Sequence, residues 1–270
     1  MSERFYGNLD ADKLDQWIES AEGGSSLKGS ELSRRAVSIM ADGGKRMMQT
    51  VVDYKELMMT YSCAIKEVRT KFEVLSTEFA VRYQRNPISS MSSRLKKTSG
   101  IAEKLSKKGL PFTVENVEEN IHDVAGVRVI CGYIDDIYMI ADAFLSQDDI
   151  TLLEKKDYIA HPKENGYRSL HLIVEVPVFF STYKKSVKAE VQIRTMAMDF
   201  WASLEHQLRY KSDVKGCKEV EERLKTCAEV ISKTDEEMLQ IRRRIESLNK
   251  DQDDEEILLE KLSKLDIRIE

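Results

Sequence analysis

Two carboxylates, Asp123 and Glu190, stand beside residues that could hold phosphate groups. Asp123 directly precedes the β-branched run VAGVRVIC, and Glu190 lies inside a second such run, SVKAEVQIR. Magnesium commonly takes only one or two carboxylates from a protein and completes its octahedron with waters and substrate phosphates. Asp123 and Glu190 are therefore a sufficient pair for metal-assisted transfer of a phosphoryl or pyrophosphoryl group.

Basic residues gather between positions 82 and 108, where eight lysines and arginines stand against one acidic residue, Glu103. The chain as a whole has a net charge of -5, which argues against general nucleic-acid binding. The local excess suits a polyphosphate site or an RNA contact. Arg128, on the strand after Asp123, adds a cation to the same set. The alternative is a solvated helix face.

The segment HPKENGYRSLHLIVEVPV carries an aromatic and a histidine between a turn signal and an apolar strand. A plain hairpin would need only the Asn165-Gly166 turn and the strand. Alternation with period two places Tyr167 and His171 on one strand face. This spacing indicates that polar and aromatic side chains near the turn reach toward a ligand.

The run at 186–194 shows the same alternation. Its polar face is formed by Lys188, Glu190, Gln192 and Arg194. Four consecutive polar positions on one face are unusual for a buried strand. If this face and that of His171 lie on the same side of one sheet, then Glu190 and His171 line one cleft.

Each residue taken alone has a structural alternative. Asp123 could cap a turn, Glu190 could pair with Lys188 or Arg128 on a solvated sheet face, and His171 could be a structural histidine. The combination of basic segment, carboxylate, strand arginine, aromatic loop and second carboxylate favours phosphoryl or pyrophosphoryl transfer. Such chemistry needs cations on the phosphates and a base for the attacking hydroxyl.

These residues must be positioned by an α+β fold, a mixed sheet flanked by helices. Heptad-like spacing from Met47 to Phe79 predicts a long helix that ends before Pro87. We read the basic segment that follows as helical and EKKDYIAHPK as a loop. Runs at 124–131, 167–176 and 186–194 predict strands, DDIYMIADAFLS between the first two predicts a crossover helix, and the pattern from MAMDFWASLEHQLRY onward is helical.

Three segments follow from this order: an accessory N-terminal segment over 1–44, a domain over 45–215 and a helical tail over 216–270. A turn at Asp42-Gly43-Gly44 would separate the first two. No apolar run reaches about 18 residues, and the N-terminus lacks a signal peptide's apolar stretch, so we expect a cytoplasmic protein with no membrane contact. The four cysteines form no CxxC pair, which disfavours zinc and a disulfide framework.

Four blocks, taken in order, resemble the small alarmone synthetases of the RelA/SpoT homologue family, and most closely its RelQ-like and RelP-like branch. They are SRLKKTSGIAEKL at 93–105, DVAGVRVIC at 123–131, HPKENGYRSLHLIV at 161–174 and EVQIRTMAMDFWASLEHQLRYK at 190–211. The resemblance implies a nucleotidyltransferase-like fold. It also implies transfer of the β,γ-pyrophosphate of ATP to the 3′-hydroxyl of GDP or GTP, which yields (p)ppGpp and AMP in stringent-response signalling; GMP is a further acceptor to consider.

The resemblance also implies roles for individual residues. Asp123 and Glu190 would hold Mg²⁺, and Glu190, supported by Gln192, would activate the attacking hydroxyl. The ATP-binding residues would be Arg94, Lys96, Lys104 and Arg128, with the two arginines flanking adenine. Tyr167 would stack on guanine, and the other residues on the acceptor side would be Lys163, Asn165, His171 and Arg194.

Three hypotheses stay open at this point, and the alarmone synthetase is preferred. The second keeps the chemistry but changes the acceptor to the tRNA 3′ end, or makes adenosine alarmones. The third is a nucleotide-binding or RNA-binding module without catalysis, which would predict loss of Asp123 or Glu190. The heptad-like seam and the resemblance both suggest a homotetramer, and single-stranded RNA is a candidate regulator.

Overall fold

The computed structural model describes residues 30–83, 85–211 and 218–249, with side chains described over 51–83, 85–208 and 218–248. The chain divides into two compact units, residues 1–54 and 55–270. The second unit carries the sheet and all of the predicted site residues. Within the described residues, no helix is long and apolar enough to cross a membrane.

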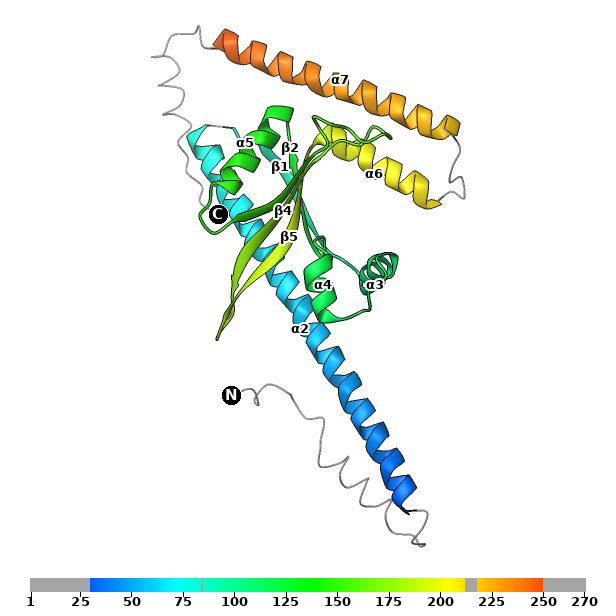
Figure 1. Ribbon diagram of the computed structural model, residues 1–270. Coiled ribbons are helices and arrows are strands. Elements are labelled where there is room, and N and C mark those ends of the chain that lie inside the picture. Colours follow the sequence, from blue (N-terminus) through cyan, green and yellow to red (C-terminus); the bar gives the residue numbers. More distant parts are fainter. Residues whose placement is uncertain (1–29, 84, 212–217, 250–270) are drawn as a thin grey trace. The chain divides into compact units, whose positions relative to one another are not determined.

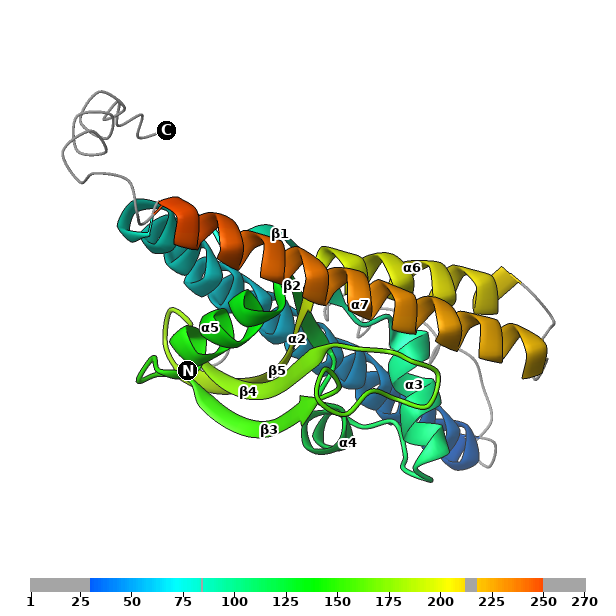
Figure 2. The same ribbon diagram turned by 90° about the horizontal axis from the view of Figure 1, so that it is seen from above.

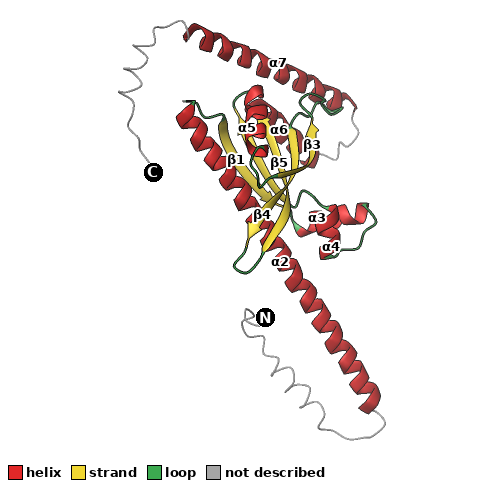
Figure 3. Cartoon of the chain, turned by 60° about the vertical axis from the view of Figure 1, so that its left-hand side comes forward, coloured by secondary structure: helices red, strands yellow, loops and turns green. Residues whose placement is uncertain are grey.

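A five-stranded mixed sheet forms the centre of the second unit (Figure 3). Its strands are β1 (Ile88–Leu95), β2 (Ala125–Cys131), β3 (Thr151–Asp157), β4 (Leu170–Phe179) and β5 (Lys184–Thr195), in the spatial order β1-β2-β5-β4-β3. Only β2 and β5 pair in parallel; the other neighbours are antiparallel. This arrangement places β2 and β5 at the middle of the sheet, with β1 and β3 at its edges.

Six helices accompany the sheet in the described part of the chain (Figure 1). They are α2 (Ser30–Arg82), α3 (Thr98–Lys107), α4 (Val114–Asn120), α5 (Ile134–Leu145), α6 (Met196–Lys211) and α7 (Lys218–Asn249). α5 is the predicted crossover helix after β2. α6 and α7 run side by side (Figure 2).

The main core lies on the apolar face of the sheet. Alternation buries Val127, Val129, Val191, Ile193 and Leu172 on this face, each at most 1 % exposed. α5 contacts β2 and β5, and its Phe144 stacks on Phe72 of α2 with ring centroids 4.5 Å apart. An aromatic pair of this kind adds about 1 kcal/mol beyond its buried area.

The predicted α+β fold is confirmed, with two strands added at the sheet edges. Residues 88–95, expected within a basic helix, form β1. Residues 154–157, the start of the expected loop EKKDYIAHPK, form the second half of β3 instead. Most side chains of both edge strands are exposed. An edge strand therefore needs no apolar alternation, and the periodicity that predicts a buried strand is missing there.

The expected turn at Asp42-Gly43-Gly44 is wrong, because α2 continues through it from Ser30. A glycine inside a helix costs only about 1 kcal/mol relative to alanine, which a 53-residue helix can tolerate. The end of this helix before Pro87 is confirmed. The side chain of Met47, the first residue of the predicted seam, lies outside the described residues.

Candidate active site

Two rows of residues cross the whole sheet on its polar face. The first row runs through Ser92, Arg128, Gln192, His171 and Lys156, one residue from each strand. The second runs through Arg94, Gly126, Glu190, Ile173 and Glu154. Residues in register on neighbouring strands point to the same side. Glu190 and His171 therefore share one face, as the alternation in the sequence predicts.

A hydrogen-bonded chain of side chains ends on Glu190. Arg194 Nη2 donates to the Tyr167 hydroxyl at 2.5 Å, and that hydroxyl lies 2.9 Å from His171 Nε2. His171 Nδ1 lies 3.1 Å from Glu190 Oε1. Since an ionised carboxylate only accepts hydrogen bonds, Nδ1 carries the proton, and Nε2 accepts from Tyr167. The chain thus holds the His171 ring in one tautomer and one orientation.

Glu190 is kept ionised although its side chain is only 15 % exposed. Burial alone would raise the pKa of this carboxyl. The hydrogen bond and the electrostatic attraction of His171, together with the hydrogen bond from Gln192 Nε2 at 2.9 Å, outweigh burial and leave the pKa below its ordinary value. An ionised carboxylate in the middle of the sheet is suited to accept a proton or to bind a cation.

Asp123 lies in the short segment before β2, against two lysines. Its Oδ2 accepts from Lys96 Nζ at 3.0 Å and from Lys104 Nζ at 2.7 Å. Burial raises the pKa of Asp123, but the hydrogen bonds and charges of Lys104 and Lys96 lower it further, below its ordinary value. The backbone holds this arrangement, since Lys96 N donates to Val124 O at 2.8 Å.

The residues present fit a divalent cation at Asp123. Its second oxygen, Oδ1, is buried without a hydrogen-bond partner in the described part of the chain. A buried carboxylate oxygen left unpaired is costly and is a ready metal ligand. Groups of three or more histidine, cysteine, aspartate or glutamate residues that could form a protein-only cage are absent from the described ranges. A single carboxylate oxygen of this kind fits Mg²⁺, which takes one or two carboxylates and keeps waters and phosphates as its other ligands.

Three arginines, on β1, β2 and β5, lie close enough to influence one another near Glu190. Arg94 is on β1, Arg128 is on β2 and Arg194 is on β5. The positive charges of Arg94 and Arg194 both act on the guanidinium of Arg128. Burial and the nearby charge of Arg194 lower the pKa of Arg128. The carboxylate of Asp199 offsets part of this repulsion between the arginines. Its Oδ1 lies 3.2 Å from Arg128 Nη1 and 3.1 Å from Arg194 Nη1. Arg128 Nε is buried without a partner among the described residues, so this group is suited to bind an anion or a flat ring.

The loop over residues 161–169 connects β3 to β4 and carries three of the predicted site residues. It is closed by Gly166 N donating to Lys163 O at 2.8 Å and by the Asn165 side chain, whose Oδ1 accepts from Tyr167 N at 3.2 Å. Lys163 Nζ lies 4.9 Å from the Tyr167 ring centroid. The ring of Tyr167 thus packs beneath a cation and beside the start of β4, rather than on the strand itself as predicted.

Arg194 is placed differently from the other predicted ligand residues. It is 4 % exposed, and its guanidinium contacts Ser169, Gln192, Asp199 and Tyr167. These partners engage all three nitrogens of the guanidinium group. Arg194 therefore orients Tyr167 and Gln192 from within the protein, while Lys96, Lys104 and Lys163 keep their ammonium groups nearer the surface.

Three residues near the site were not selected from the sequence. Lys156 stands beside His171 in the first row, Tyr158 packs edge-on against His171 at 5.3 Å, and Asp199 bridges two arginines. Asp199 could have been found from its place in the first turn of the helix after β5. Lys156 and Tyr158 could not, because residues 154–163 were read as a loop, whereas Lys156 lies in β3 and Tyr158 directly follows its end.

Comparison with protein families and known proteins shows which proteins this chain is similar to. The family described as "Region found in RelA / SpoT proteins" matches residues 93–215. GTP pyrophosphokinase YwaC of Bacillus subtilis is 43% identical over 200 residues, 74% of this chain and 95% of that protein. GTP pyrophosphokinase YjbM of the same organism is 35% identical over 193 residues, 72% of this chain and 90% of that protein.

Solved structures of similar proteins share the fold. Small alarmone synthetase 2 from Bacillus subtilis aligns with a TM-score of 0.65 at 43% identity, over 71% of this chain and 99% of that one. Small alarmone synthetase 1 from Bacillus subtilis, bound to its product pppGpp, aligns with a TM-score of 0.66 at 35% identity, over 71% of this chain and 97% of that one.

Proposed function

Because this chain belongs to the RelA/SpoT family, in its small alarmone synthetase branch, we propose that it is a GTP pyrophosphokinase that makes (p)ppGpp from ATP and GDP or GTP. The 3′-oxygen of the acceptor bonds to the β-phosphorus of ATP. The bond from that phosphorus to the oxygen shared with the α-phosphate breaks, and AMP leaves. The displacement is in line, so positioning and charge neutralisation carry most of the catalysis.

The position of Glu190 is the observation that carries this proposal. It lies between the arginine side of the sheet and the tyrosine and histidine side, next to Gly126, which places no side chain beside it. Its carboxylate is ionised and oriented by His171 and Gln192. Glu190 therefore takes the proton of the attacking 3′-hydroxyl, and Gln192 holds the carboxylate in place.

ATP would lie over the basic half of the site. Lys96 and Lys104 already converge on Asp123 and would bind the phosphates of ATP. Arg94 and Arg128, from adjacent strands, would flank the adenine, with the planar faces of their guanidinium groups against the base.

The acceptor nucleotide would lie over the 161–169 loop. Tyr167 offers its ring to the guanine, which requires Lys163 to move from the ring toward the acceptor phosphates. Asn165 and His171 complete this side, and Arg194 acts through the Tyr167 hydroxyl. The proposed acceptor site and the proposed general base would then lie on one hydrogen-bonded chain, which supports these roles.

Mg²⁺ would be held by Asp123 Oδ1 and by Glu190. When bound, it would neutralise charge on the transferred pyrophosphate. Lys96 and Lys104 hold the other oxygen of Asp123, so this carboxylate stays ionised and oriented.

The direct test is incubation of the purified protein with Mg²⁺, γ-labelled ATP and, in parallel, GMP, GDP, GTP and bulk tRNA. Transfer of label to a guanine nucleotide, with release of AMP, is the expected result. Label found only on tRNA would support the second hypothesis. No transfer to any acceptor would contradict the proposal and favour a nucleotide-binding module.

We also propose that the protein is a cytoplasmic homotetramer. Each chain would have three parts: residues 1–44, the synthetase domain over 45–215 and the tail over 216–270. Support for assembly comes from exposed apolar side chains at helical spacing on α6, namely Met196, Phe200 and Leu204. A monomeric mass in light scattering would contradict it. We further propose that single-stranded RNA, as a regulator, would bind the exposed lysines of α3. Filter binding in the presence and absence of ATP would test this contact.

A further inference from the structure

α7 presents one helical face to the site domain. Leu224, Ala228, Ile231 and Asp235 recur at spacings of four, three and four, which places them on one side of the helix. Ala228 belongs to a buried cluster with Trp201 and Ala202 of α6, and Tyr167 packs against that cluster. The segment expected to be a separate tail thus reaches the residue proposed to stack on the acceptor base.

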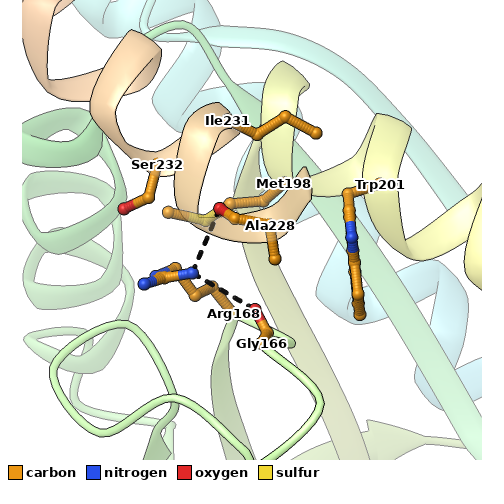
Figure 4. A pocket seen from close by; sticks show the side chains of 7 residues that line it. All are labelled: Gly166, Arg168, Met198, Trp201, Ala228, Ile231 and Ser232. Carbon is orange, nitrogen blue, oxygen red and sulfur yellow. Dashed lines mark hydrogen bonds between the residues drawn. The ribbon is translucent and has the colours of Figure 1, made fainter. Parts of the chain in front are cut away.

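The closest approach is between α7 and the 161–169 loop. Gly166 adopts φ +88°, and a β-carbon placed on it would lie 2.5 Å from Ala228 Cβ. The two backbones can meet here only because glycine and alanine face each other. Figure 4 shows the Arg168 guanidinium between the two, with Nη1 donating to Gly166 O at 3.2 Å and to Ala228 O at 3.3 Å.

Two further contacts hold α7 against α6 and against the end of β5. Trp201 Nε1 donates to Leu224 O at 3.0 Å, and the Thr195 hydroxyl donates to the buried carboxylate of Asp235. Thr195 directly follows Arg194, whose guanidinium holds the Tyr167 hydroxyl. α7 is therefore joined both to the loop that carries Tyr167 and to the strand end that orients its hydroxyl.

We propose that Ala228 of α7 is a positioning residue for the acceptor nucleotide, acting through Gly166 and Arg168 on the ring of Tyr167. This inference rests on the proposed function, since it assigns the 161–169 loop to the acceptor. Ala228 of α7 contacts the loop directly, whereas the residues assigned to ATP, such as Arg94, Lys104 and Arg128, lie on β1, α3 and β2. The contact sets the affinity for the guanine nucleotide and not the affinity for ATP.

The test uses Ala228→Val, which adds volume where the loop backbone allows none, and Arg168→Gln, which removes the guanidinium between the two carbonyls. Cys227→Val is the matched control, because it places the same residue at the next, exposed position of the same helix. The measurement is steady-state kinetics of the full chain, with KM determined separately for GDP or GTP and for ATP.

We expect both test variants to raise the acceptor KM about tenfold or more, as overpacking of a close contact does, with the ATP KM within about twofold of wild type. Cys227→Val should match wild type in both. Equal changes in the two KM values, or no change in either, would overturn the inference. Ala228→Gly, which leaves the close approach free, should retain the wild-type ratio of the two KM values.

The inference can fail separately from the proposed function. If wild-type protein transfers pyrophosphate and the variants do not differ, only the inference falls. If wild-type protein transfers no pyrophosphate, the proposed function falls. Amide hydrogen exchange over residues 161–169 then still tests whether Ala228 supports the loop. Faster exchange there in Ala228→Val than in Cys227→Val would support the contact, and equal exchange would overturn it.

Discussion

His171 Nδ1 lies 3.1 Å from Glu190 Oε1, and the opposite nitrogen of the same ring lies 2.9 Å from the Tyr167 hydroxyl. One imidazole therefore joins the residue proposed to bind the acceptor base to the residue proposed to take the acceptor's proton. This relationship makes the ionisation of Glu190 depend on a neighbour that is distant in sequence.

Replacing His171 with leucine should move the acidic limb of the pH profile of kcat/KM to higher pH. Glu190 must be ionised to accept a proton, and its pKa is lowered in the native site because hydrogen bonds outweigh burial. Without His171 the burial cost is less well compensated, so the pKa rises and the ionised fraction falls sooner as the pH falls. His161→Gln, in the exposed part of the loop, is the control; an unchanged acidic limb in His171→Leu would contradict the role given to His171.

Removing either carboxylate should separate binding from chemistry. Glu190→Gln and Asp123→Asn keep the shape of each side chain but lose its charge. We expect kcat to fall about 100-fold or more in each, because a base or a metal ligand is lost. ATP should still bind through Lys96 and Lys104, as isothermal titration would show. A near wild-type rate in Asp123→Asn would contradict the proposed metal site.

Two substitutions at Tyr167 should distinguish its ring from its hydroxyl. Tyr167→Phe keeps the stacking surface but loses the contact with His171, so we expect a lower kcat and an acceptor KM within about threefold of wild type. Tyr167→Ala also loses the ring, which should raise the acceptor KM by about tenfold or more, since stacking on an aromatic ring contributes about 1–3 kcal/mol. Equal acceptor KM values for the two variants would argue against base stacking.

Asp235→Asn should stabilise the protein at neutral pH. Burial raises the pKa of Asp235 more than the Thr195 hydroxyl lowers it, so the fold favours the neutral form. The pKa of Asp235 is therefore higher in the folded state than in the unfolded state. The charged carboxylate lowers the stability of the fold at pH values above the folded-state pKa, and this loss disappears below the unfolded-state value near 4. We expect Tm to rise by about 2–4 °C at pH 7.5.

The same comparison at about pH 3 should show a difference in Tm close to zero, because below the unfolded value near 4 the carboxyl is largely neutral in both states. Glu237→Gln, two residues further along the exposed side of α7, should leave Tm unchanged at both pH values. A lower Tm for Asp235→Asn at pH 7.5 would show that the charged carboxylate stabilises the contact with Thr195.

The sequence by itself determined the elements that alternate or repeat. The period of two in 186–194 correctly placed Glu190 and Gln192 together on one face, and the β-branched run before Cys131 correctly predicted β2. These signals are strong because β2 and β5 are central strands with a buried face, and burial forces the apolar alternation. The blocks around Asp123, Tyr167 and Glu190 were enough to indicate the family.

Only the tertiary structure decided how those elements meet. The edge strands β1 and β3 carry no apolar period, so Lys156 could not be assigned to the row that contains His171. The burial of Arg194 and the approach of Ala228 to Gly166 depend on partners 27 and 62 positions away in the chain. Local periodicity reports which side of an element is buried, but not which distant residue covers it, because that is set by packing between elements.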